Sequence, residues 1–122
     1  MNTCARMVAL TAALLSLSAV VLAALGSHAI AMNGLQNSWQ TASITHMFNA
    51  AGLLGLAALL GNFPSRLLSA GTWLIVLGTC IFCGSIYLHV ITGYTISGVT
   101  PLGGMVMMAG WLIAASAFLR KS

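Results

Sequence analysis

The chain has 122 residues, of which 60% are hydrophobic and 3% charged, and it contains four Lys and Arg residues but no Asp or Glu. A soluble domain carries roughly 25% charged residues, so this chain must present part of its surface to lipid. The lack of carboxylates excludes glycosidase chemistry by paired carboxylates, and proton or cation sites built from Asp and Glu. The cations are too few and too widely spaced for nucleic-acid binding.

Four apolar segments predict four membrane-spanning helices in a single transmembrane domain over residues 1–122. The predicted spans cover about residues 7–31, 44–62, 67–91 and 102–119. A helix that crosses the hydrocarbon needs about 20 apolar residues, whereas a barrel strand would alternate in polarity over about ten. Backbone groups in lipid must be satisfied within the segment, so we expect an all-α integral membrane protein. Short loops predict an antiparallel four-transmembrane-helix bundle.

The first segment ends in "GSHAIAMNG", in which Ala29, Ile30 and Ala31 form a small-x-small pattern like a signal peptidase site. The apolar core of a signal peptide is about 7 to 15 residues long. This apolar run is longer, so we expect a retained span rather than a cleaved signal peptide.

The loops predict the topology. Residues 32–43 and 92–101 carry no charge, and their Trp39 and Tyr94 suit the membrane interface. With four spans, every cation falls on the opposite side, which should be the cytoplasm. We therefore expect both termini on the cytoplasmic side of a bacterial inner membrane. The four cations are Arg6, Arg66, Arg120 and Lys121.

Small residues in the later spans suggest where helices pack. Membrane helices associate through close backbone approach at small residues rather than by hiding leucine from lipid. Gly55, Gly84, Gly103 and Gly110 are the predicted packing positions. Their contacts could lie within the bundle or against another subunit.

Polar side chains gather on the uncharged side. His28, His46 and His89 all fall there, with Asn49 one turn after His46 and Tyr87 close to His89. These five form a predicted outer-face cluster, either a ligand site or a hydrogen-bonding site. A histidine at a membrane boundary is satisfied by water or backbone, so hydrogen bonding is the leading interpretation, and we expect no cofactor.

The alternative is a metal centre. His28, His46 and His89, together with Met105 or Met108, would suit copper, and imidazoles alone would suit zinc or haem. Each histidine stands alone on its helix, however, and methionine commonly fills apolar cores.

The string "CIFC", from Cys80 to Cys83, has the spacing of a redox motif. It lies inside a predicted span, where burial among apolar groups makes a thiol inert. We therefore expect no redox function.

Four strings, taken together, resemble one family. "GSHA", "ITHMFNAAGLLGLA", "GTCIFCGSIY" and "TPLGGMVMMAGW" are similar, in this order, to signatures of the domain-of-unknown-function family four hundred and twenty-three. These are small four-span proteins of bacterial inner membranes with mitochondrial relatives. The resemblance implies a four-helix membrane protein and no particular activity. Asn49 stands where the family pattern usually has histidine, and Cys83 where serine is common, so a metal or proton role for that histidine does not carry over.

These features predict a non-catalytic accessory or helix-packing subunit of a larger inner-membrane assembly. Its expected partners are the lipid bilayer and either an integral membrane protein or a second copy of the chain. The alternatives are the metal or haem site described above and a small oligomeric transporter or channel. No nucleophile–base pair is visible in the sequence, so we expect no enzyme.

Overall fold

The computed structural model describes residues 2–95 and 97–119, and within these ranges all regular structure is helical. The helices are α1 (Thr3–His28), α2 (Gln36–Asn62), α3 (Arg66–Thr92) and α4 (Val99–Ser116). Each is long and apolar enough to cross a membrane, which confirms the all-α class and the number of candidate spans. Arg120 and Lys121 lie outside the described residues.

The helix boundaries follow local capping chemistry. The Asn2 side chain accepts a hydrogen bond from the Ala5 amide at the start of α1, and the Ser65 side chain accepts one from Leu68 at the start of α3. Side-chain acceptors at these positions satisfy amides that have no partner inside the helix. α3 ends at Thr92 and is capped by Gly93, whose φ of 75° is a left-handed conformation that glycine adopts without strain.

The α2 helix begins at Gln36, well before the predicted start of the span at residue 44. Trp39 is therefore not an interfacial loop residue, as the sequence suggested, but is buried in the first turns of α2. Hydropathy detects only the apolar part of a helix. With 27 residues, α2 is about 40 Å long and exceeds the hydrocarbon thickness of about 30 Å.

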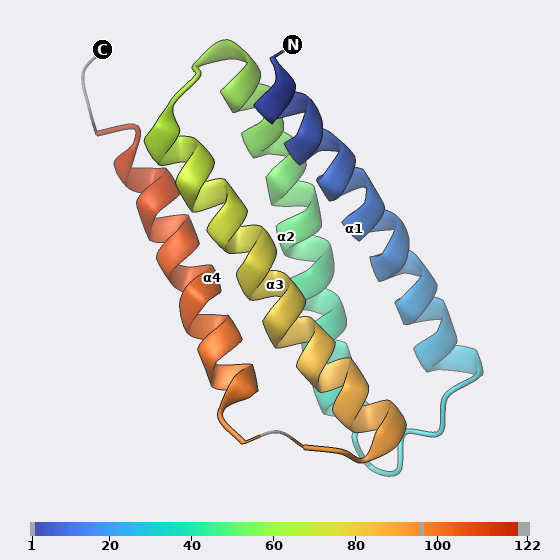
Figure 1. Ribbon diagram of the computed structural model, residues 1–122. Coiled ribbons are helices and arrows are strands. Elements are labelled where there is room, and N and C mark those ends of the chain that lie inside the picture. The colour runs from blue at the N-terminus through green and yellow to red at the C-terminus, as the bar shows by residue number, and fades with distance from the viewer. Residues whose placement is uncertain (1, 96, 120–122) are drawn as a thin grey trace.

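Figure 1 shows how the helices are arranged. The start of α1, the α2–α3 connection and the end of α4 lie at one end of the molecule, and the other two connections lie at the opposite end. α3 packs against α4 and α2, and α2 packs against α1. Large apolar side chains such as Leu14, Leu17 and Leu112 point outward, as expected of a surface that contacts lipid.

Glycines line the interface between α3 and α4, which we call the glycine seam. A Cβ atom added at Gly71 or Gly110 would lie 2.6 or 2.7 Å from a backbone nitrogen of the opposite helix, and Gly78 and Gly103 are crowded in the same way. Residues later in α3 contact residues earlier in α4. The seam pairs Gly71 with Ala114, Ile75 with Gly110, Gly78 with Met107 and Phe82 with Gly103.

The four predicted packing glycines fall into two groups. Gly103 and Gly110 are buried in the seam, in direct contact with α3. A Cβ at Gly55 or Gly84 would meet nothing within 4 Å. Gly55 and Gly84 therefore do not pack between helices of this chain, because both face outward on α2 and α3.

Candidate functional site

The described interior contains a polar contact centred on His46 of α2. This side chain is 4% exposed. Its Nε2 lies 3.1 Å from the Ser18 hydroxyl of α1, and its Nδ1 lies 3.1 Å from the Tyr87 hydroxyl of α3. A neutral imidazole donates through one nitrogen and accepts through the other, so one hydroxyl donates to the ring and the other accepts from it. His46 thus links three helices and uses both of its nitrogens.

One turn further along α2, Asn49 forms a second contact. It is 1% exposed. Its Nδ2 donates to the Thr79 hydroxyl at 2.9 Å and to the Met107 sulfur, while its Oδ1 accepts from the Trp111 indole at 3.0 Å. Asn49 therefore links α2 to both α3 and α4. We call His46, Asn49 and the side chains that contact them the polar core. The contacting side chains are Ser18, Tyr87, Thr79, Met107 and Trp111.

Trp39 closes the polar core toward the α1–α2 connection. Its ring centroid lies 4.8 Å from that of Tyr87, and its indole donates to the Leu22 carbonyl at 3.2 Å. The indole occupies the space where Gly26 would carry a side chain. Gly26 therefore has a packing role, because only glycine lets the Trp39 ring lie against α1.

Ser43 stands out next to the polar core. It lies on α2 one turn before His46, and it is 6% exposed. Among the described residues, its hydroxyl is the one fully buried side-chain oxygen or nitrogen without a hydrogen-bond partner. A buried hydroxyl without a partner costs about 1–3 kcal/mol, so the stability of a Ser43→Ala variant tests whether this hydroxyl is satisfied.

The predicted five-residue cluster is brought together only in part. His46, Asn49 and Tyr87 lie in the polar core, but His28 is exposed at the end of α1. His89 is only partly buried, and its Nδ1 contacts the Thr95 hydroxyl at 2.7 Å. Sharing one side of the bundle was therefore not enough to bring these side chains together.

The side chains considered as metal ligands also lie in different environments. Among the described residues, no three His, Cys, Asp or Glu side chains lie close enough to hold a metal ion. Met105 and Met108 are 63% and 64% exposed, whereas Met107 between them contacts Asn49. Within one chain, the described geometry therefore does not bring His28, His46 and His89 together as three ligands of one metal ion.

The two cysteines of "CIFC" differ in environment. Cys80 is exposed and Cys83 is buried, and both are free thiols. The Cys83 thiol donates to the Ala42 carbonyl of α2 at 3.4 Å. Cys83 therefore acts as one more link between α2 and α3.

Several members of the polar core were not found from the sequence. Ser18, Thr79 and Trp111 complete the contacts of His46 and Asn49. Hydroxyl residues in a membrane helix often bond to their own backbone, as Thr79 also does to the Ile75 carbonyl. Polarity inside an apolar span was the only available signal, and it does not reveal the partner.

The geometry defines a class of protein: four apolar helices, each able to span a membrane, whose interior polar side chains are engaged mainly with one another. The family model described as "Protein of unknown function (DUF423)" matches residues 22–104. The chain belongs to this family of membrane proteins.

Several bacterial proteins are similar to this chain. The UPF0382 membrane protein YwdK of Bacillus subtilis is 32% identical over 116 residues, covering 86% of this chain and 89% of its own length. The UPF0382 inner membrane protein YgdD of Escherichia coli is 31% identical, covering 84% and 83%. A UPF0382 membrane protein of Staphylococcus saprophyticus is 31% identical, covering 74% and 82%. No solved structure matches the chain.

Proposed function

We propose that this chain is a non-catalytic accessory subunit that packs, through its outward-facing helix surfaces, against another protein of the bacterial inner membrane. The proposal rests on one observation: Gly55 and Gly84 lie in candidate spans and face open space. Glycine inside a helix costs about 0.5–1 kcal/mol relative to alanine. Close contact with a helix of another protein would offset this cost, since small residues let helix backbones approach in a membrane.

The hydrogen bonds of the polar core support the proposal that the subunit is not catalytic. Both nitrogens of His46 and both polar atoms of Asn49 have partners within the chain. The sequence has no carboxylate that could orient a histidine as a base. The core groups thus serve to join the helices.

We further propose an antiparallel bundle with both termini on the cytoplasmic side. Arg6 and Arg66 belong to the end of the molecule where α1 and α3 begin, and Arg120 and Lys121 follow α4 in the sequence. Cytoplasmic loops carry an excess of Lys and Arg. The name of the Escherichia coli relative supports the inner membrane as the location.

Thiol cross-linking in intact membranes tests the accessory role. Cys80 is exposed and lies one turn before Gly84, on the same face of α3. In a Cys4→Ser, Cys83→Ser background, Cys80 should give one reproducible adduct with another membrane protein, and Gly84→Leu should abolish it. The matched control carries Cys80→Ser in addition to Cys4→Ser and Cys83→Ser, and its single thiol is Leu17→Cys. Leu17 is an exposed residue of a different helix, α1.

The products decide between the alternatives. Mass spectrometry of the Cys80 adduct should identify the same membrane protein in repeated preparations. An adduct of twice the mass of this chain would mean that the surface binds a second copy of the chain rather than another protein. No adduct, or equal adducts from Cys80 and from Leu17→Cys, would refute the proposed surface.

A further inference from the structure

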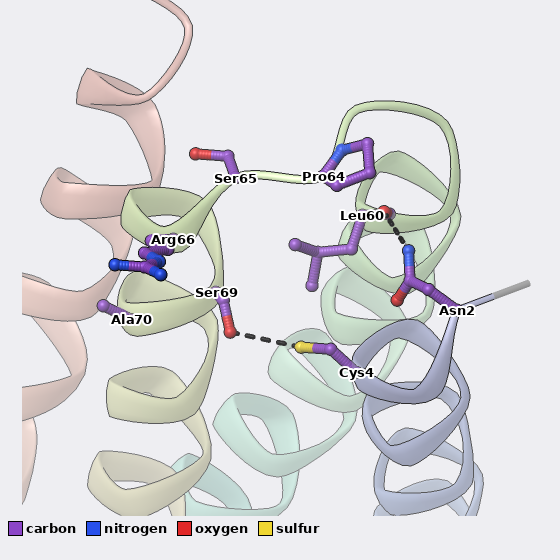
Figure 2. Close-up of a pocket in the computed structure, with 8 residues that line it drawn as sticks. All are labelled: Asn2, Cys4, Leu60, Pro64, Ser65, Arg66, Ser69 and Ala70. Atoms are coloured by element: carbon purple, nitrogen blue, oxygen red, sulfur yellow. Dashed lines mark hydrogen bonds between the residues drawn. The ribbon is translucent and has the colours of Figure 1, made fainter.

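A groove of about 650 Å³ lies at the end of the molecule where α1 and α3 begin. Its lining includes Cys4 of α1, Leu60 of α2, and Arg66, Ser69 and Ala70 of α3. Figure 2 shows Cys4 and Ser69 pointing toward each other between the two helices. Its volume falls within the range of small-molecule sites, roughly 300–1,000 Å³.

Most polar groups along the groove already have partners. The Cys4 sulfur lies 3.1 Å from the Ser69 hydroxyl, and the Asn2 amide donates to the Leu60 carbonyl at 3.0 Å. These contacts tie α1 to α2 and α3 beneath the groove. Arg66, which is exposed at the start of α3, is the charged residue in the lining of the groove.

The charge of Arg66 cannot be balanced by a side chain of this protein. The sequence contains no Asp and no Glu. The first turns of α1 and α3, which both meet the groove, contain no acidic residue either. Helix N-termini carry partial positive charge, so this end of the molecule favours an anion that no side chain of this protein can supply.

We propose that the groove binds an anionic phospholipid, with the headgroup phosphate at Arg66 and an acyl chain along the apolar lining. The lining is mostly apolar, which suits an acyl chain but adds nothing for a free phosphate. The candidate spans bring this end of the bundle to the level of the headgroups, where basic pockets between helices recognise anionic lipids. The proposal rests on these spans, not on the accessory role.

Native mass spectrometry of the detergent-solubilised chain tests this proposal. The probes are phosphatidylglycerol and phosphatidylcholine with identical acyl chains, and inorganic phosphate alone. The variants are Arg66→Gln, which removes the groove's cation, and Ala70→Leu, which fills part of the groove at an exposed position without changing charge. Arg6→Gln is the matched control, because Arg6 is an exposed cation of α1 that does not line the groove.

We expect one phosphatidylglycerol molecule to bind in preference to phosphatidylcholine. Arg66→Gln should weaken this binding about fivefold, the factor that corresponds to one cation at an anionic lipid. Ala70→Leu should also weaken it, and Arg6→Gln should leave it nearly unchanged. Circular dichroism of each variant checks that the helices remain.

Three results would overturn the proposal. The first is equal binding of the two lipids, and the second is equal loss in Arg66→Gln and Arg6→Gln, which would mean general attraction between charges. The third is binding of inorganic phosphate as tight as that of phosphatidylglycerol, which would make the site an anion site without a lipid chain. A loss of cross-linking at Cys80 would not affect any of these measurements.

Discussion

The glycine seam and the polar core hold neighbouring helices together by different contacts. In the seam, the backbones of α3 and α4 touch, and no side chain fits between Gly78 and Met107. In the polar core, α2 is joined to its neighbours by hydrogen bonds from the side chains of His46 and Asn49. Seam contacts depend on shape alone, whereas core contacts depend on matched donors and acceptors. The two regions should therefore respond to different kinds of substitution.

The largest effect should come from adding a methyl group to the seam. Gly78→Ala places a Cβ into the backbone of Met107, which cannot move aside as a flexible side chain would. Overpacking costs about 1–3 kcal/mol, and a contact with backbone should lie at the upper end. Unfolding by SDS, followed by circular dichroism, measures the loss.

Gly84→Ala is the control for the seam, because its new Cβ would meet open space. In the isolated chain it should be neutral or should stabilise by up to about 1 kcal/mol. Equal losses for Gly78→Ala and Gly84→Ala would mean that the seam is no more crowded than the outer face.

The next largest effect should come from Asn49→Ala. This change leaves the Trp111 indole without its acceptor and the Thr79 hydroxyl without its donor. Hydrogen bonds between membrane helices contribute about 0.6 kcal/mol each on average and at most about 1.7, so we expect a loss of about 2 kcal/mol in the same assay. Asn62→Ala should change little, because the exposed Asn62 bonds only to its own helix. Similar losses for both variants would argue against the polar core.

A smaller loss is expected from Tyr87→Phe. The ring stays against Trp39, and only the hydroxyl contact with His46 is removed. The expected cost is about 0.6 kcal/mol, and a double-mutant cycle with His46→Ala should show that the two side chains are coupled. Additive losses would disprove the contact. Tyr94→Phe, at an exposed position, serves as the control.

The smallest change should have the opposite sign. Ser43→Ala removes a buried hydroxyl without a partner, so stability should rise by up to about 1 kcal/mol. Ser18→Ala removes a hydroxyl that contacts His46 and should lower it. A loss in Ser43→Ala comparable to that in Ser18→Ala would show that Ser43 has a partner in the membrane.

The sequence by itself determined the number of helices that can span a membrane, the lack of carboxylates and the family. These properties are local, because the length of each apolar segment can be read directly from the sequence. His46, Asn49 and Tyr87 could also be singled out, since polar residues inside an apolar span are conspicuous. Their hydrogen-bond partners could not.

Only the tertiary structure decided which face of each helix points inward. Met107 is buried between the exposed Met105 and Met108, and Gly110 packs where Gly84 does not. In a soluble helix, the apolar stripe marks the inner face. Here lipid and interior are both apolar, so hydropathy gives no such mark, and the rotation of each helix is set by backbone contacts and hydrogen bonds with its neighbours.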